Sequence, residues 1–251
     1  MRILIVSDIH ANLEALEACL EAAPEYDQVF NLGDIVGYGA NPNEVTEHAR
    51  ALGTVFVRGN HDKACSGVSN LDSFNPIAGL AAIWTQQKLT AENLDFLRDL
   101  PRGPLSPREQ LQLVHGSPRD EDQYLLLLSE ADPLLAQASV ALTFFGHTHV
   151  QRCFMMEQGE RTGKSLVPSY KSARGKQNVT LHLKATTKYL VNPGSIGQPR
   201  DSDPRAAFLL YDTDENSITF YRVPYDVGHA QEKILSAGLP QRLATRLAEG
   251  R

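Results

Sequence analysis

Asn31-Leu32-Gly33-Asp34-Ile35-Val36-Gly37-Tyr38-Gly39 begins as the end of an apolar run and continues as a glycine-rich turn. Its single carboxylate, Asp34, stands where the apolar run stops. Taken alone, a Gly-Asp pair after a strand indicates an ordinary turn or a helix cap. The significance of Asp34 therefore depends on which residues follow the other strands of the chain.

Strand and helix patterns alternate over the first sixty residues. Strands are expected at 2–6, 28–32 and 54–57. Helical patterns separate them, and a β-α-β-α-β order favours parallel strands with right-handed crossovers. In such sheets the functional groups collect beyond the carboxyl ends of the strands. Asp8, Asp34 and Asn60 all occupy such positions.

The rest of the chain contains a helical cover or insertion at about 65–100, a short helix starting near Asp132-Pro133, a polar basic loop at 157–177 and a helical tail at 226–251. Two further strands are expected at 111–114 and 140–145. The strands that follow favour an antiparallel or mixed sheet. They are expected at 151–155, 179–183, 188–191, 206–211 and 217–223. Because no linker divides the sequence, we expect 1–251 to form a single domain.

Composition limits the class of protein. The chain has 251 residues and a formal net charge of -6, which argues against a surface for nonspecific nucleic-acid binding. Three distant cysteines without a CxxC pattern indicate a reducing compartment. The sequence shows neither a signal peptide nor an apolar run of membrane-spanning length. We therefore expect a cytoplasmic protein that does not bind membranes.

Potential metal ligands follow five of the expected strands. They are Asp8 with His10, Asp34, Asn60 with His61, His115, and His147 with His149. Five of the eight histidines lie at these strand ends, which scattered core or surface histidines would not do. Carboxylate, amide and imidazole ligands together suit Mn²⁺, Fe or Zn²⁺. Seven ligands exceed one ordinary site and suit two ions that share a carboxylate, about 3.5–4 Å apart.

Each member of this set has an ordinary alternative. Asp8 or Asn12 alone would more often cap a helix. A lone His115 would more often be a hydrogen-bonded core histidine, and the His147-Thr148-His149 triplet alone is a weak indication of metal binding. The hypothesis of a metal centre therefore depends on the whole set.

The ordered motifs resemble those of the calcineurin-like metallophosphoesterases. The matching stretches are Ser7-Asp8-Ile9-His10, Gly33-Asp34-Ile35-Val36-Gly37-Tyr38-Gly39, Gly59-Asn60-His61-Asp62, His115-Gly116 and Gly146-His147-Thr148-His149. The stretch 192–201, from Asn192 to Asp201, resembles a further signature of the small bacterial and archaeal phosphodiesterase branch. The resemblance implies a four-layer α/β/β/α sandwich with two mixed sheets and a dimetal centre.

The resemblance also implies a division of the ligands. The first metal would be held by Asp8, His10 and His149, the second by Asn60, His115 and His147, and both by Asp34 as the bridge. Two divalent ions are expected, with Mn²⁺ the first choice and Fe or Zn²⁺ as alternatives.

The implied function is dimetal-dependent hydrolysis of phosphoester bonds, with a metal-bridged hydroxide attacking phosphorus in line. We expect a phosphodiesterase that acts on a small nucleotide-like diester. A phosphomonoesterase or a dinucleoside polyphosphate hydrolase is an alternative, and a non-catalytic metal-binding scaffold is an alternative of another class. The expected partner is a small phosphorylated substrate, and a homo-oligomer is left open.

His61 and Asp62 are the catalytic candidates. His61 is adjacent to Asn60 and would protonate the leaving oxygen or stabilise its charge. Asp62 would orient the ring of His61 and favour its imidazolium form, although a local cap carboxylate is the alternative.

Four further residues are candidates for substrate contacts because they lie next to the metal motifs or can grip a phosphate: Asn12, Tyr38, Arg119 and Arg200. For each arginine, an ordinary surface position is an equal alternative. The basic loop 157–177 is expected to be a solvated hairpin, and contact with an anionic substrate is the alternative.

Overall fold

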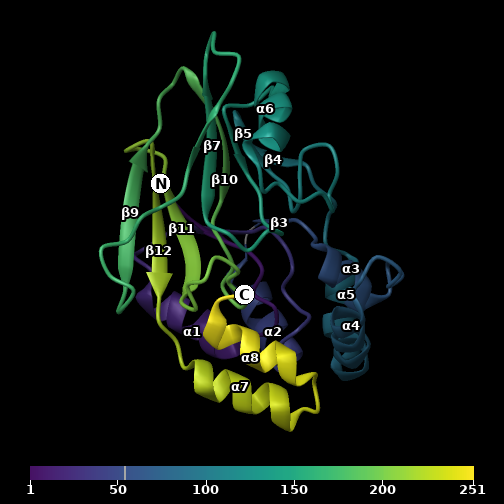
Figure 1. Ribbon diagram of the computed structural model, residues 1–251. Helices are drawn as coiled ribbons and strands as arrows, with labels where there is room; N and C mark the ends of the chain where they lie inside the picture. The colour runs from purple at the N-terminus through teal and green to yellow at the C-terminus, as the bar shows by residue number, and fades with distance from the viewer. Residues whose placement is uncertain (54) are drawn as a thin grey trace.

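Two six-stranded sheets stack face to face in the computed structural model, which describes residues 1–53 and 55–251 (Figure 1). The strands of the first sheet, in spatial order, are β3 (Val55–Phe56), β2 (Gln28–Asn31), β1 (Arg2–Val6), β11 (Ala206–Asp212), β12 (Ser217–Val223) and β9 (Gln177–His182). The strands of the second are β4 (Leu105–Arg108), β5 (Leu111–Leu113), β6 (Leu142–Phe144), β10 (Thr187–Asn192), β7 (Arg152–Glu157) and β8 (Lys164–Leu166). The expected first residue of the third strand, Thr54, lies outside the described residues.

Both sheets are mixed, as predicted. In the first, β1 runs parallel to β2 and antiparallel to β11. In the second, β10 runs parallel to β6 and antiparallel to β7. The later strands do not form a sheet of their own, because β9, β11 and β12 complete the first sheet while β7, β8 and β10 complete the second.

The residues of β1 alternate between two cores. Ile3 and Ile5 pack in the cluster between the sheets, together with side chains such as Phe144 of the second sheet. Leu4 and Val6 pack in the cluster under the helices. A strand that is buried on both faces must be apolar at every position, which explains the unbroken run at the start of the sequence.

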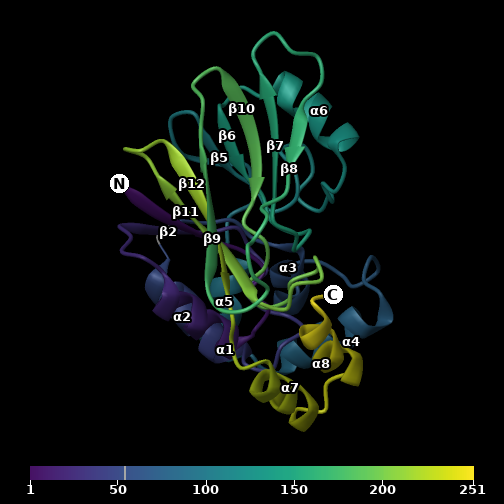
Figure 2. The same ribbon diagram turned by 60° about the vertical axis from the view of Figure 1, so that its left-hand side comes forward.

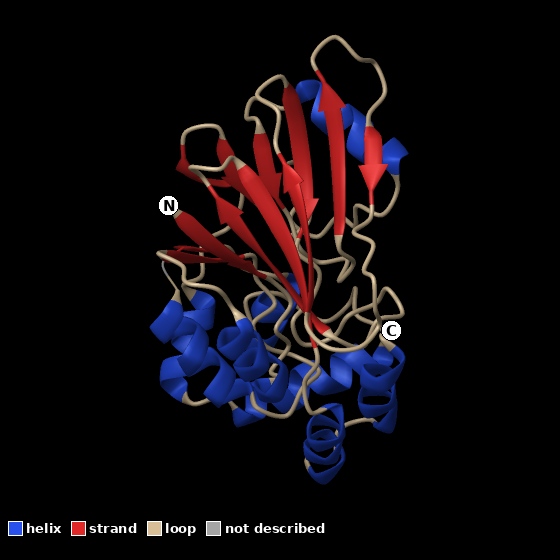
Figure 3. Ribbon diagram, turned by 90° about the vertical axis from the view of Figure 1, so that its left-hand side faces the viewer, coloured by secondary structure: helices blue, strands red, loops and turns tan. Residues whose placement is uncertain are grey.

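Helices cover the outer faces of both sheets and confirm the α/β/β/α order (Figure 3). On the first sheet lie α1 (Leu13–Ala22) and α2 (Pro42–Leu52), and α6 (Leu128–Gln137) packs on the second. The expected cover at 65–100 consists of α4 (Pro76–Lys88) and α5 (Ala91–Arg98), while α3 (Asn60–Ser66) begins earlier. The tail forms α7 (Val227–Ser236) and α8 (Gln241–Glu249).

One expected helix start is wrong. The helix expected near Asp132-Pro133 begins at Leu128, because Glu130 Oε2 accepts the backbone N–H groups of Leu126 and Leu127, just before the helix. None of the described helices has the length and apolar character needed to cross a membrane.

Candidate metal centre

The strand ends that were expected to hold ligands converge at one end of the two stacked sheets. Four residues, Asp8, His10, Asp34 and His149, place ligand atoms within 4.8 Å of one another. Asp34, His115 and His147 form a second such group. Asn60 joins the second group, since its Oδ1 lies 3.3 Å from His115 Nε2. The structure thus brings together all seven expected ligands.

Each of the four histidines uses one ring nitrogen to bond a backbone carbonyl. The bonds run from His10 Nδ1 to Val36 at 3.0 Å, from His115 Nδ1 to Leu32 at 2.7 Å, from His149 Nδ1 to Gln198 at 2.6 Å and from His147 Nε2 to Asp122 at 3.0 Å. A carbonyl accepts only from a protonated nitrogen, so the other ring nitrogen presents a lone pair when the ring is neutral. This is the usual arrangement of a metal-binding histidine.

The remaining ring nitrogens face one another in pairs. His10 Nε2 lies 3.1 Å from His149 Nε2, and His115 Nε2 lies 3.2 Å from His147 Nδ1. In neutral rings, the form that burial favours for His10 and His149, these atoms are acceptors that cannot bond each other. A cation between them would satisfy both.

The two carboxylates each keep one oxygen for protein donors. Asp8 Oδ2 accepts from the Ser7 hydroxyl at 2.6 Å and from the His147 N–H at 3.1 Å. Asp34 Oδ1 accepts from the His61 N–H at 2.8 Å. Within the described chain the other oxygens, Asp8 Oδ1 and Asp34 Oδ2, are buried without a hydrogen-bond partner. Buried oxygens of this kind are costly unless they bind a cation, so the residues fit divalent metal ions.

Asp34 occupies the position between the two groups. Its Oδ2 lies 3.6 Å from His10 Nε2 and 3.4 Å from His115 Nε2. Burial alone would raise the pKa of Asp34, but the charge of His115 holds that pKa well below its usual value. Its carboxylate is therefore anionic and is shared by both groups.

Five of the expected ligands have a left-handed backbone. Their φ angles are 52° at Asp8, 51° at His10, 56° at Asp34, 68° at His147 and 59° at His149. Such a conformation costs a non-glycine residue about 1–3 kcal/mol and is concentrated at functional sites. The surrounding hydrogen bonds therefore hold these side chains at the centre against their local backbone preference.

Comparison with known proteins agrees with this geometry. Residues 1–216 match the model of the calcineurin-like phosphoesterase superfamily domain. The chain belongs to this superfamily. A metallophosphoesterase from Sphaerobacter thermophilus has a similar crystal structure, with a TM-score of 0.85, 40% identity, and coverage of 100% of this chain and 99% of that chain. The protein is therefore a phosphoesterase, and the non-catalytic scaffold alternative is not retained.

Two further relatives share sequence with the phosphoesterase. Uncharacterized protein MJ0912 of Methanocaldococcus jannaschii is 37% identical over 262 residues, which cover 99% of this chain and 98% of that protein. A symmetrical bis(5'-nucleosyl)-tetraphosphatase of Glaesserella parasuis is 31% identical over 123 residues, which cover 46% of this chain and 44% of that protein.

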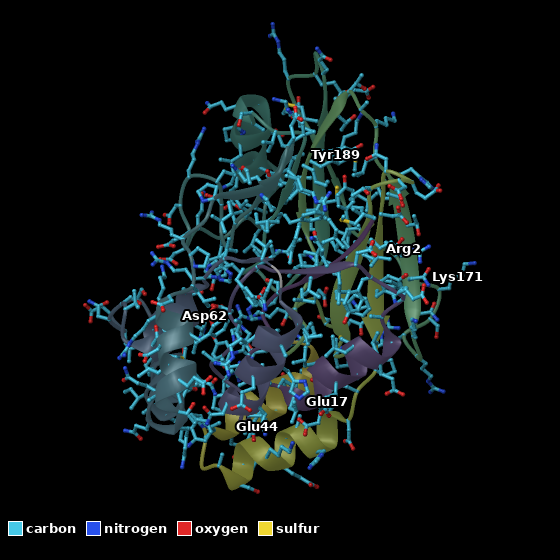
Figure 4. All side chains as sticks on the ribbon, turned by 180° about the vertical axis from the view of Figure 1, so that it is seen from behind. Arg2, Glu17, Glu44, Asp62, Lys171 and Tyr189 are labelled. Atoms are coloured by element: carbon cyan, nitrogen blue, oxygen red, sulfur yellow. The ribbon has the colours of Figure 1, made fainter. Side chains whose placement is uncertain are left out.

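Asp62 has a different role in the phosphoesterase from the one predicted. Its two oxygens accept the backbone N–H groups of four residues: Asp34 at 2.8 Å, Ile35 at 2.8 Å, Val36 at 3.3 Å and Gly59 at 2.9 Å. It therefore does not orient the ring of His61, whose Nδ1 has no hydrogen-bond partner among the described residues. Asp62 lies in the first turn of α3 and its side chain is buried (Figure 4). Asp62 is a positioning residue for the turn that follows Asp34.

His61 lies in the phosphoesterase next to the expected ligands and belongs to neither of their two groups. Its ring centroid is 4.8 Å from that of His10 and 4.3 Å from that of Tyr38. Burial lowers the pKa of His61 to about 4, although the charge of Asp34 opposes this. The predicted preference for the imidazolium form is therefore wrong, and the ring is neutral at neutral pH.

Two of the four substrate-contact candidates are engaged elsewhere. Asn12 caps α1 through its Oδ1 and donates its Nδ2 to the Gly197 carbonyl at 2.9 Å. Arg119 is exposed and donates to Gln137 Oε1 at 2.5 Å on α6. Tyr38 and Arg200 do lie at the centre, and Arg200 Nη2 is 3.3 Å from the Tyr38 hydroxyl.

A cavity of about 150 Å³ opens beside the ligands. Its aromatic lining includes Tyr38, Phe74 and Tyr124, and Tyr124 stacks on the ring of His147 with centroids 3.9 Å apart. Tyr124 was missed because no sequence motif surrounds it. Gln198, which holds His149, lies in the stretch 192–201 that had been noted only as a family signature.

The basic loop behaves as a surface segment. Residues 157–177 contain the end of β7, all of β8 and a connection to β9. Lys171 projects from the outer edge of the molecule (Figure 4). Lys176 Nζ donates to the Ala22 carbonyl at 2.6 Å, away from the candidate ligands. The hairpin is therefore confirmed only for the first part of the loop, which joins β7 to β8, while the second part connects the two sheets.

Proposed function

We propose that the protein is a phosphodiesterase that holds two divalent cations in the candidate metal centre and hydrolyses a small nucleotide-like diester. The supporting observation is the position of Asp34 Oδ2, buried without a hydrogen-bond partner and within 3.6 Å of a histidine of each group. One anionic oxygen between two sets of ligands suits two ions better than one.

The ligands divide as the resemblance implies. Asp8, His10 and His149 would hold one ion, Asn60, His115 and His147 the other, and Asp34 both. Bound divalent cations at such a centre activate water and neutralise phosphoryl oxygens. Mn²⁺ is the proposed ion, because carboxylate, amide and imidazole ligands are mixed here.

The neutral ring of His61 has a role at the leaving oxygen. The ring of His61 lines the same cavity as Asn60 and His147, so an ester oxygen bound in this cavity would lie close to the ring. A neutral imidazole donates a hydrogen bond to an oxygen that gains negative charge, and such a donor stabilises the transition state. The aromatic cavity takes the organic group of the ester.

Dinucleoside polyphosphates are the second candidate substrates. The related Glaesserella parasuis protein is a bis(5'-nucleosyl)-tetraphosphatase, and its match covers 46% of this chain. The exposed ring of Tyr124 offers a nucleobase a stacking surface beside the centre.

Elemental analysis and a substrate panel test the proposal. We expect two metal ions per chain after loading with Mn²⁺, and faster hydrolysis of bis(p-nitrophenyl) phosphate than of p-nitrophenyl phosphate. Diadenosine tetraphosphate, added as a third substrate, tests the second candidate. A single ion per chain, or a preference for the monoester, would contradict the proposed phosphodiesterase.

The compartment and the partners also remain proposals. Cys19, Cys65 and Cys153 are buried and form no disulfide within the described residues, which supports a reducing compartment such as the cytoplasm. The net charge of -6 supports a small phosphorylated substrate rather than nucleic acid.

A further inference from the structure

Two arginines lie against the ring of Tyr38 beside the metal centre. The Cζ atoms of Arg200 and Arg246 are 5.9 Å and 5.6 Å from the ring centroid. The same ring lies 4.6 Å from that of His10 and 4.3 Å from that of His61. One aromatic side chain thus separates two guanidinium groups from the candidate ligands.

Core packing fixes the helix that carries Arg246. The apolar face of α8 is buried in a cluster that also contains Tyr38 and residues of α4 and α7. Figure 2 shows α4, α7 and α8 gathered at this end of the molecule. The buried residues of α8 are Leu243, Ala244 and Leu247. Arg246 therefore projects from a packed helix and not from a loose terminus.

Hydrogen bonds join the two segments that carry the arginines. The N–H of Ser202, two residues after Arg200, donates to the Gly250 carbonyl at the end of α8 at 2.9 Å. Arg246 Nε donates to the main-chain oxygen of Arg251, the last residue of the sequence, at 2.7 Å. The Arg200 N–H donates to the carbonyl of His149, an expected ligand, at 3.1 Å. Backbone hydrogen bonds therefore hold the end of α8 against the segment of Arg200, and hold that segment against His149.

Neither guanidinium group pairs with an Asp or Glu side chain among the residues that the structure describes. Two buried arginines of this chain do: Arg205 pairs with Asp203 at 2.5 Å, and Arg222 pairs with Asp201. Burial lowers the pKa of Arg246, and the charge of Arg200 lowers it further. Arg200 Nε is also buried without a hydrogen-bond partner within the described chain. Within the described residues, no Asp or Glu side chain neutralises these two neighbouring cations, although Arg200 Nη2 also donates to Gln198 Oε1 at 3.2 Å.

We propose that Arg200 and Arg246 form an anion-binding subsite for a second phosphate group of the substrate, next to the phosphate that is hydrolysed. This assignment rests on the proposed function. A guanidinium group can donate two parallel hydrogen bonds to phosphate oxygens. Two guanidinium groups also offset the negative charge of a phosphate, which an uncharged ligand does not carry. Arg246 lies beyond residues 1–216, so part of this selectivity comes from a segment outside the matched superfamily domain.

Calorimetric titration of the Mn²⁺-loaded protein with AMP and ADP tests the subsite. We expect the wild type to bind ADP more tightly than AMP. Arg246→Gln should reduce this preference about tenfold, as expected for the loss of a charge-assisted hydrogen bond. Arg242→Gln is the matched control, because Arg242 is exposed on the same helix and makes no ring contact with Tyr38 among the described residues. It should keep the preference of the wild type.

Equal weakening of AMP and ADP by Arg246→Gln, or no change, would overturn the subsite. If thermal melting shows that Arg246→Gln is unfolded, Arg200→Gln is measured in its place. The same titrations are repeated in the presence of inorganic phosphate. If inorganic phosphate abolishes the preference of the wild type for ADP, the subsite binds free phosphate, and its assignment to a second phosphate group of the substrate is wrong. Hydrolysis of bis(p-nitrophenyl) phosphate by the wild type tests the proposed function separately, since this ester has no second phosphate.

Discussion

The carboxylate of Asp62 accepts the backbone N–H of Asp34 at 2.8 Å, so one buried acidic residue positions the other at the metal centre. The bond is one of four that Asp62 accepts from backbone donors around the turn after Asp34. Several residues of that turn and of the neighbouring loops have left-handed φ angles. Asp62 therefore supplies part of the energy that keeps a strained ligand in place.

Asp62→Asn should destabilise the fold and weaken metal binding together. An amide has only one acceptor oxygen, and its NH₂ group would face a backbone N–H in a fully buried site. We expect a loss of about 2 kcal/mol in the free energy of unfolding, measured by chemical denaturation. Asp95→Asn is the control, because the side chain of Asp95 is 70% exposed. Unchanged stability and metal content in Asp62→Asn would show that the four bonds are dispensable.

Asp34→Asn should reduce the occupancy of both metal sites, because its Oδ2 lies between the two groups of ligands. Asp8→Asn should mainly empty one site, since Asp8 belongs to one group only. Elemental analysis of the two variants after identical loading with Mn²⁺ gives the comparison. If Asp34→Asn loses a single ion, the bridging assignment is wrong.

His61→Ala should lower turnover by about 10²–10⁴-fold while both ions stay bound, since the ring borders the substrate cavity without being a ligand. Steady-state kinetics with bis(p-nitrophenyl) phosphate and elemental analysis measure the two quantities. His48→Ala, at an exposed position of α2, should leave both unchanged. A missing ion in His61→Ala would make this histidine structural.

Gly37→Ala should displace the ring of His61. A Cβ atom at Gly37 would lie 2.4 Å from His61 Nδ1, and the φ of +88° disfavours any residue with a side chain. We expect both a lower melting temperature and a lower turnover. Gly79→Ala is the control: a Cβ there meets no atom within 4 Å, and alanine in a helix should raise stability by about 0.5–1 kcal/mol. Full activity of Gly37→Ala would mean that turnover does not depend on the position of the His61 ring.

The ligands were predictable because they follow strands. An apolar run that ends at a carboxylate or a histidine is visible in one sequence, and parallel strands place their carboxyl ends along one edge. The pairing of β1 with β11 was not predictable in this way, because nothing local in 2–6 or 206–212 specifies the partner strand. The sequence therefore predicted that the C-terminal strands form a sheet of their own, whereas they complete both six-stranded sheets.

Residue roles were harder to predict than residue positions. Asp62 is next to His61 in sequence, yet the first turn of α3 directs its carboxylate to the turn after Asp34. Arg119 follows His115 closely, yet it points to α6. Arg246 shows no motif at all and reaches Tyr38 only because α8 packs against that ring. Such roles depend on tertiary contacts between distant segments.

The centre is closed by a late part of the chain. The N–H groups of Ile196 and Gly197 donate to the carbonyls of Ser7 and Asp8, and the Gln198 carbonyl holds His149. During synthesis on the ribosome, a nascent chain that ends before these residues has every proposed ligand but lacks the bond that orients His149. Because β11 must also reach β1 before the first sheet is whole, we expect hydrolytic competence only after nearly all of the polypeptide has emerged.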